Sequence, residues 1–220
     1  MRTRNYEYYV ADFETTVYKG QQFTEVWAAA VVKLGTEDVE VLHSLPDFLS
    51  YIFAQKTNIV CYFHNLKFDG NFILDYILRN GYTWNREAEG KMLNKQFKCA
   101  ISDRGAWYSI TIKMHNMIIE FRDSLKLLPF SVKRIGKGFQ TKHKKLDMEY
   151  EGFRYAGCVI TDEEKEYIRN DVLVVKEALE IMFERGHQKL TIGSCCLEEF
   201  KTTYDKIEYN NFFPDLTNIA

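Results

Sequence analysis

The stretch YFHNLKFDGNF, residues 62–72, says most about the fold of this chain. It begins inside an apolar run at residues 58–63 that predicts a buried strand, and it leads into a helix expected over about residues 69–78. His64, Asn65 and Asp69 stand among aromatic side chains between the two. An acid, an imidazole, an amide and aromatic rings at one strand end suit a metal-bound phosphate beside a stacked base.

The elements on either side of this stretch predict an α/β fold. Residues 7–14 predict a strand that ends in acids, and residues 27–34 and 39–42 predict a hairpin. A helix is expected at residues 45–54 after a Ser44 cap, and a longer one from Thr161 to about Arg185, with Glu164 completing a capping box. The remaining expectations are strands at 96–101, 107–114 and 117–121, irregular structure with one short helix at 123–155, and a helix at 189–200. This order predicts a mixed sheet flanked by helices.

Length and charge are those of an ordinary globular domain. The chain has 220 residues and a formal net charge of -2, which excludes a globally basic protein but not a local basic patch. Such a patch, taken alone, is more often a solvated loop face than a nucleic-acid site. One segment gathers seven cationic side chains: Lys133, Arg134, Lys137, Lys142, His143, Lys144 and Lys145.

The cysteines and the amino-terminal segment indicate a reducing compartment. The five cysteines have neither CxxC nor Cys/His zinc spacing, so we expect neither a disulfide framework nor a structural zinc. No segment has the pattern of a signal peptide or the apolar length of a membrane span. We therefore expect a cytoplasmic protein with no membrane partner.

Two pairs of side chains could bind metal or act on a substrate. Asp12 and Glu14 are two apart on a predicted strand, so they leave the same face, and paired carboxylates suit Mg²⁺ or Mn²⁺. Tyr167 and Asp171 are four apart on the long helix and share one of its faces. Each pair alone has an ordinary explanation, as a chance strand end or as a surface acid beside a core-margin tyrosine.

Taken together, these residues predict phosphodiester hydrolysis. Asp12, Glu14, Asp69 and Asp171 supply four acids, a set that can hold two divalent ions on a phosphodiester. Tyr167 could orient the attacking water through its hydroxyl group. A water activated by one ion and a leaving 3′ oxygen stabilised by the other would account for the whole set.

Three motifs resemble the 3′-to-5′ proofreading exonuclease domain of the protein-primed B-family DNA polymerases of small bacteriophages. They are DFETT at residues 12–16, YFHNLKFDGNF at 62–72 and YIRND at 167–171, and the segment DSLKLLPF at 123–130 is also similar to this family. The similarity runs from about Tyr8 to about Pro214, and the second motif is the specific one. The resemblance implies a ribonuclease H-like (DnaQ-like) fold, in which a mixed sheet is flanked by helices.

The resemblance also implies roles for individual residues. Asp12, Glu14, Asp69 and Asp171 would bind two Mg²⁺ or Mn²⁺ ions, with Tyr167 orienting the water. A lysine that contacts the scissile phosphate corresponds to Lys145, with the adjacent Lys144 as the alternative. The lining of a channel for the 3′ end of single-stranded DNA would be Thr15, Tyr62, His64, Asn65, Phe68, Phe72, Ser124 and Leu125. For Phe68 and Phe72, a place in the core is an equally good expectation.

The family pattern includes a polymerase region that this sequence does not match. Neither its S-L-Y-P-like motif nor its D-T-D motif occurs, so we expect one exonuclease domain over residues 1–220, without palm, fingers or thumb. The resemblance then implies an excised proofreading module or a free-standing relative, working in the cytoplasm of an infected host cell. A polymerase domain or a priming protein would be its partner.

Two other functions remain open at this point. A non-catalytic single-stranded DNA-binding or partner-docking module could keep the same fold, although four intact acids and Tyr167 argue against lost activity. Ribonuclease action is also open, since no residue of the sequence identifies a reader of the 2′-hydroxyl group.

Overall fold

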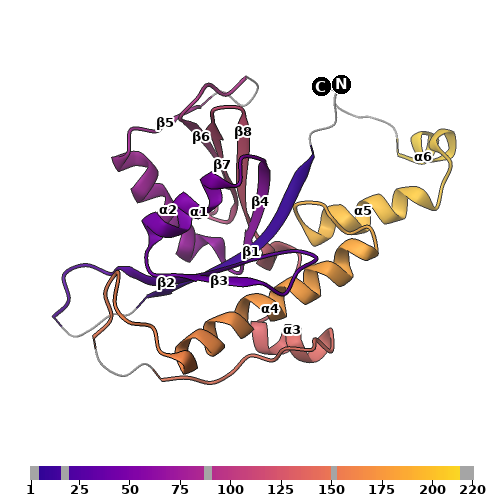
Figure 1. Ribbon diagram of the computed structural model, residues 1–220. Helices are drawn as coiled ribbons and strands as arrows, with labels where there is room; N and C mark the ends of the chain where they lie inside the picture. The colour runs from indigo at the N-terminus through magenta and orange to yellow at the C-terminus, as the bar shows by residue number, and fades with distance from the viewer. Residues whose placement is uncertain (1–4, 16–19, 87–90, 150–152, 214–220) are drawn as a thin grey trace.

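The computed structural model describes residues 5–15, 20–86, 91–149 and 153–213 (Figure 1). Thr16 of the DFETT motif and residues 150–152 of the segment 123–155 lie outside these residues. The strands are β1 (Tyr6–Thr15), β2 (Val26–Lys33), β3 (Val39–Leu42), β4 (Asn58–Phe63), β5 (Thr83–Trp84), β6 (Gln96–Ile101), β7 (Trp107–Met114) and β8 (Met117–Asp123). The helices are α1 (Leu45–Ala54), α2 (Leu66–Arg79), the 3-10 turn η1 (Ser124–Lys126), α3 (Val132–Gly138), α4 (Asp162–Glu184), α5 (Ile192–Thr202) and α6 (Lys206–Phe212).

The strands form one mixed sheet in the order β3-β2-β1-β4-β8-β7-β6-β5. At its centre β1, β4 and β8 run parallel, with Ala11 opposite Phe63 and Phe63 opposite Asp123. The carboxyl ends of these three strands therefore meet at one edge of the sheet. Polar side chains that follow them are brought together there, as is usual at the carboxyl edge of open α/β sheets.

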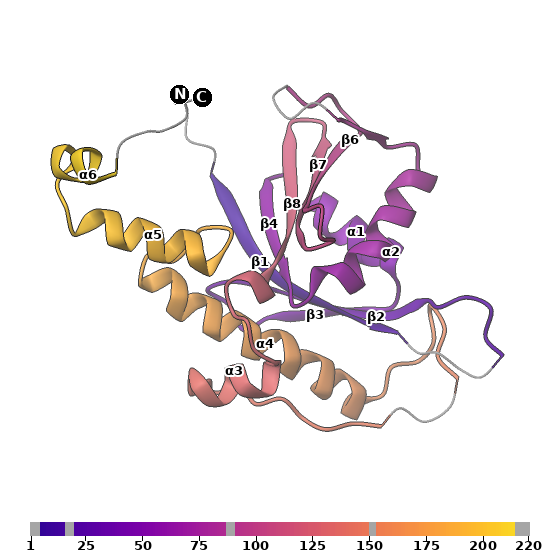
Figure 2. The same ribbon diagram turned by 180° about the vertical axis from the view of Figure 1, so that it is seen from behind.

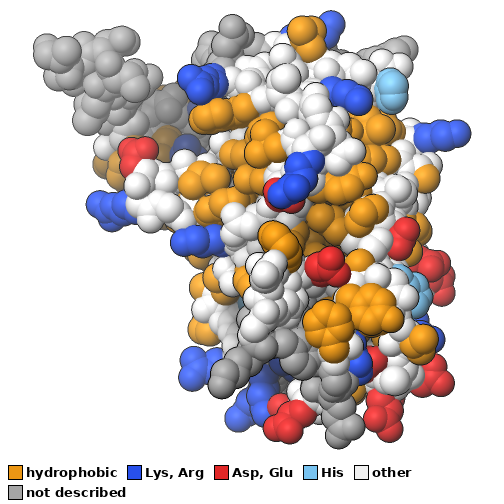
Figure 3. All heavy atoms as spheres, turned by 90° about the vertical axis from the view of Figure 1, so that its left-hand side faces the viewer, with side chains coloured by type: hydrophobic (Ala, Val, Ile, Leu, Met, Phe, Trp, Pro, Cys, Tyr) orange, Lys and Arg blue, Asp and Glu red, His pale blue; other side chains and the backbone are white. Residues whose placement is uncertain are grey.

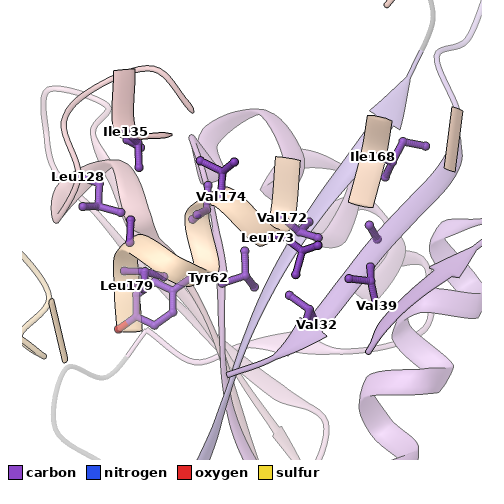
Figure 4. Packing of buried hydrophobic residues seen from close by; sticks show 14 of the residues in the cluster. Val32, Val39, Tyr62, Leu128, Ile135, Ile168, Val172, Leu173, Val174 and Leu179 are labelled. Atoms are coloured by element: carbon purple, nitrogen blue, oxygen red, sulfur yellow. The ribbon is translucent and has the colours of Figure 1, made fainter. Parts of the chain in front are cut away.

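Helices cover both faces of the sheet (Figures 1 and 2). Because side chains alternate along a strand, Val10 and Tyr62 point to the face that α3 and α4 cover, while Ala11 and Phe63 point to the face that α1 and α2 cover. Figure 4 shows the first core, where Val172 and Leu179 of α4 pack over the sheet. Burial of these two apolar faces supplies the main driving force for folding.

Most of the expected elements are confirmed. The hairpin of β2 and β3 and the strands β6 and β7 are present, and α1 begins after the Ser44 cap, whose hydroxyl accepts from the backbone N–H of Asp47 at 3.2 Å. The capping box of α4 is complete, with Thr161 and Glu164 bonded in both directions. The α/β architecture, a mixed sheet flanked by helices, is thus confirmed.

The start of α2 differs from the prediction. The helix begins at Leu66, three residues before the expected Asp69. Asn65 adopts a left-handed conformation with φ of 77° and gives no side-chain cap. Instead, the carboxylate of Asp123 accepts the backbone N–H groups of Asn65 and Leu66 at 3.0 and 3.3 Å. A helix capped by a residue so far along the chain gives no local signal in the sequence.

Smaller differences lie elsewhere. α5 begins at Ile192 and not near residue 189, because the Thr191 hydroxyl accepts from the backbone N–H of Ser194. β8 extends two residues beyond the expected end, and β5 and α6 were not predicted. Among the described helices, none combines the length and apolar character that crossing a membrane would require.

Candidate active site

Three carboxylates from two distant elements meet at the carboxyl end of β1. Asp12 and Glu14 leave the face of β1 that α4 covers, because they follow Val10 at intervals of two. Asp171 reaches them from α4. One ligand oxygen from each of the three acids can be chosen so that all lie within 4.8 Å of one another. At this separation the three carboxylates could share one cation, and without a cation they would repel one another.

Asp69 adds a fourth acid from α2. Its side chain is only 2% exposed and accepts a hydrogen bond from the backbone N–H of Phe13 in β1. It interacts electrostatically with both Asp12 and Glu14. We call Asp12, Glu14, Asp69 and Asp171 the acid cluster.

The surroundings disfavour negative charge on these acids. Burial raises the pKa of Asp69 to about 8, with the neighbouring Glu14 and Asp123 adding to it. Desolvation, followed by the charge of Asp69, raises the pKa of Asp12 well above its usual value. Burial also raises the pKa of Asp171, although Lys145 opposes that shift. Charge that burial and repulsion penalise in this way is stabilised by nearby cations.

The acid cluster fits divalent metal ions. Asp69 Oδ1 and Asp171 Oδ1 are buried and find no hydrogen-bond partner in the described part of the chain. Buried polar atoms normally have a partner, so an oxygen left over in a carboxylate cluster indicates a missing cation or water. Carboxylate oxygens are the ligands that Mg²⁺ and Mn²⁺ prefer.

Lys145 and Tyr167 border the acid cluster. The ammonium of Lys145 pairs with Asp171 and donates to the Tyr167 hydroxyl at 3.0 Å, and it lies 4.8 Å from the centre of the tyrosine ring. Lys144 points elsewhere and donates to the backbone carbonyls of Gly136 and Thr141. Of the two adjacent lysines, the structure places Lys145 beside the acids.

The turn after β4 carries the polar residues of the second motif. His64 donates from Nε2 to the Phe130 carbonyl at 2.8 Å, and its Nδ1 lies 3.0 Å from the Ser124 hydroxyl. Burial lowers the pKa of His64, although the Phe130 carbonyl opposes that shift. The imidazole is therefore held on both sides, next to a cavity that Asp12 and Asp171 also line.

Two residues expected to line the DNA channel are buried in this structure. Tyr62 is 1% exposed; its ring packs 6.0 Å from that of Phe183 and near Leu179 in the α4 core (Figure 4). Ser124 is fully buried and lies against His64 and the Phe63 carbonyl. The alternation of β4 and the start of η1 turn both side chains inward, and their contact with the strand stays a prediction.

The other expected lining residues are accessible to different degrees. Phe68 is 49% exposed on α2, with its ring 5.8 Å from that of the partly buried Phe72. Asn65 is exposed, and Thr15 and Leu125 are partly exposed. Figure 3 shows hydrophobic side chains gathered over the upper half of the face on the α2 side of the molecule.

Asp123 is a residue of this site to which the sequence assigned no role. Its Oδ1 accepts three backbone N–H groups, from Asn65, Leu66 and Leu125, and its Oδ2 lies 3.3 Å from Lys126. The carboxylate is 2% exposed. Its place in the DSLKLLPF segment was the one indication in the sequence that it matters. Its contacts with Asn65 and Leu66 depend on the parallel pairing of β4 with β8.

Comparison with known proteins relates this chain to part of the DNA polymerases of one family. Residues 52–157 match the family described as DNA polymerase type B, organellar and viral. The DNA polymerase of Bacillus phage B103 is 37% identical over 215 residues, covering 94% of this chain, and that of Streptococcus phage Cp-1 is 33% identical over 227 residues, covering 95% of it. The chain is related to the exonuclease region of phage type B DNA polymerases.

Solved structures agree with this relationship. The Phi29 DNA polymerase complexed with primer-template DNA has a TM-score of 0.83 and 34% identity, covering 94% of this chain and 36% of its own. The same polymerase complexed with single-stranded DNA matches with the same values. The predicted exonuclease-type fold is thus confirmed. The chain spans 36% of the length of the phage B103 polymerase and 37% of that from phage Cp-1.

Proposed function

We propose that this chain is a metal-dependent 3′-to-5′ exonuclease that hydrolyses the terminal phosphodiester of single-stranded DNA, as in proofreading. The observation that carries the proposal is the acid cluster, which gathers four carboxylates from β1, α2 and α4 beside Lys145 and Tyr167. Two of its buried oxygens lack partners within the described residues. The relationship to phage DNA polymerases, one of them solved with single-stranded DNA, points to DNA as the substrate.

The four acids would hold two Mg²⁺ or Mn²⁺ ions. When bound, such ions neutralise the carboxylates, lower the pKa of a bound water and offset the negative charge that develops on a leaving oxygen. The pKa values of Asp12 and Asp69, raised by desolvation and mutual repulsion, would return toward normal with this charge in place.

The chain's own residues position the reactants. The Tyr167 hydroxyl, held at 3.0 Å by Lys145, would accept or donate a hydrogen bond to orient the attacking water. The water oxygen attacks phosphorus, the bond from phosphorus to the 3′ oxygen breaks, and a proton passes to that oxygen. The products are a nucleoside 5′-monophosphate and a strand shortened by one nucleotide. The ammonium of Lys145 would stabilise the negative charge of the phosphate during this step.

The surface around the turn after β4 would receive the terminal bases. Phe68 offers an exposed ring face, and base stacking on such rings tolerates any sequence. Asn65 and Thr15 are accessible for polar contacts, while Ser124 would act by holding His64 in place. A frayed mismatched end would reach this surface more readily than a paired one, because base pairing no longer holds it.

The setting is also part of the proposal. Because the relatives are DNA polymerases about a third of whose length this chain spans, a polymerase domain is the expected partner and a priming protein a second one. The compartment would be the cytoplasm of a phage-infected cell.

A digestion assay tests the proposal. The purified protein is incubated with a 5′-labelled single strand and Mg²⁺ or Mn²⁺, beside Asp12→Ala/Glu14→Ala and, as a matched control, Asp38→Ala/Glu40→Ala on the far hairpin. We expect a ladder of 3′-shortened products from the parent and the control, and none from the site variant. No ladder from the parent with either metal would refute the enzyme and leave a binding module. An RNA strand in parallel determines the preferred sugar.

A further inference from the structure

The structure separates the cationic segment of residues 133–145 into two groups. The side chains from residue 142 onward all have partners within the protein. They are Glu37 for Lys142, Glu177 for His143, the carbonyls of Gly136 and Thr141 for Lys144, and Asp171 with Tyr167 for Lys145. These contacts fold the segment against α4 and the β2–β3 turn, and they account for that part of the positive charge.

The cationic side chains of α3 lack such buried or close partners among the described residues. The side chains of Arg134 and Lys137 are exposed and make no hydrogen bond or ion pair with any residue that the structure describes. Lys133 has only a pair with Asp147 at 3.7 Å, in which both side chains are largely exposed. Lys133 and Lys137 are also one helical turn apart, a spacing at which like charges repel. An anion from outside the chain would reduce the repulsion among these three side chains.

These lysines open onto a groove beside the acid cluster. The groove has a volume of about 410 Å³ and is lined by Lys133, Gly136, Lys137, Gln140, Lys144 and Lys145. We call it the lysine groove. A Cβ at Gly136 would meet Thr141 and Val174 at 3.2 and 3.4 Å, so the glycine lets α3 lie close against α4 (Figures 1 and 2).

The lysine groove shares a lining residue with the cavity at the acid cluster. A smaller cavity of about 170 Å³ is lined by Asp12, Asp171, His64 and Val132, and Lys145 lines both cavities. Val132 is also the residue before Lys133 at the start of α3. The two cavities therefore lie on either side of Lys145, so a ligand long enough to reach past this residue could contact both.

The chemistry of the groove fits a chain of phosphates. Lysine ammonium groups are point charges that bind phosphate without reading sequence. Lys133 and Lys137 are about 6 Å apart along α3, which offers successive charges and not one converging site. A single free phosphate or nucleotide would use only one end of this row.

We propose that the lysine groove binds the sugar-phosphate backbone of the single strand whose 3′ end lies at the acid cluster. This inference rests on the proposed function, since it assumes that a strand occupies the cluster. The groove would hold the nucleotides on the 5′ side of the scissile bond. It would thereby increase affinity for longer strands without selecting their sequence.

The test measures strand binding without cleavage. In the Asp12→Ala/Glu14→Ala background, the affinity for a 5′-fluorescein 15-nucleotide thymidine strand is measured by anisotropy at several salt concentrations. For single strands, each lost phosphate contact reduces the slope of log affinity against log salt by about 0.7. K133Q/K137Q should therefore weaken binding and reduce the slope by about 1.4. The matched control K91Q/K206Q, two exposed lysines outside the groove, should leave the slope unchanged.

Two outcomes would overturn the inference. One is a K133Q/K137Q variant whose affinity and salt slope equal those of the control. The other is competition by thymidine 5′-monophosphate that depends on the same two lysines, because the groove would then be a nucleotide site. Digestion of the same strand by the parent with Mn²⁺ separates the two proposals. A ladder with an unchanged slope refutes only the groove, whereas an altered slope without a ladder refutes only the nuclease.

Discussion

Replacing Asp123 with alanine should destabilise the protein strongly, because this one carboxylate caps two turns. It accepts backbone N–H groups of Asn65, Leu66 and Leu125 at 3.0, 3.3 and 3.0 Å. Leu66 is fully buried, so its N–H would be left without a partner, at a cost of about 1–3 kcal/mol. The two partly buried bonds would each lose about 1 kcal/mol. Relief of repulsion between Asp123 and Asp69 offsets part of this loss.

The net loss for Asp123→Ala is therefore roughly 3 kcal/mol in the free energy of unfolding. For a chain of this length, that corresponds to a decrease in Tm of about 6–12 °C. Digestion of a single strand, measured where both proteins are folded, should fall by about 10–100-fold, because the turn that starts α2 also positions Asp69. Asp123→Asn keeps an acceptor oxygen and should recover about half of the lost stability.

Thermal unfolding followed by circular dichroism, together with the digestion assay, checks this prediction. Asp103→Ala removes an exposed acid from the β6–β7 turn and should change the free energy of unfolding by less than about 0.5 kcal/mol. A loss below about 1 kcal/mol for Asp123→Ala would show that the carboxylate does not cap these turns. Unchanged digestion by a clearly destabilised variant would show that the turn does not position the site.

Further predictions concern the core, the acids and the lysine. In chemical denaturation, Tyr62→Ala should lower the free energy of unfolding by about 3–5 kcal/mol, and Tyr62→Phe by much less. A Tyr62→Ala variant that keeps its stability but no longer digests DNA would instead indicate that Tyr62 lines the channel. The Asp69 pKa of about 8 means that the folded state keeps a proton that the unfolded chain releases near pH 4. Without metal, Tm should therefore fall as pH rises from 4 to 8, and Mn²⁺ should restore it at pH 8. Asp69→Asn should make Tm depend less on pH. A Tm of the parent that rises over this pH range would contradict the prediction. Lys145→Ala should lower kcat by about 10²–10³ and Lys144→Ala by far less, and equal effects would remove the distinction between them.

Local features of the sequence were sufficient for much of the fold. The alternation at residues 7–14 placed Asp12 and Glu14 on one face, and the Thr161 cap with Glu164 fixed the start of α4. Both signals depend on neighbours within a few residues, where backbone geometry and side-chain period act directly. The motif at residues 62–72 likewise indicated the family that the comparisons support.

Features that depend on distant residues were not predictable in this way. The start of α2 was missed because its cap is Asp123, some 57 residues further along the chain. The inward direction of Tyr62 depends on which face of β4 meets Phe183 of α4. The position of Lys145, and not Lys144, beside Asp171 depends on how the preceding turn is anchored to Gly136 and Thr141.

The sequence by itself thus predicted the residues of the proposed site, because their types and spacing follow from local geometry. Only the tertiary structure decided how they meet. The parallel pairing of β1, β4 and β8 brings three strand ends to one edge, and α4 then closes over β1 to add Asp171. Contacts between segments more than 50 residues apart leave no periodic trace in either segment, and the acid cluster is made of such contacts.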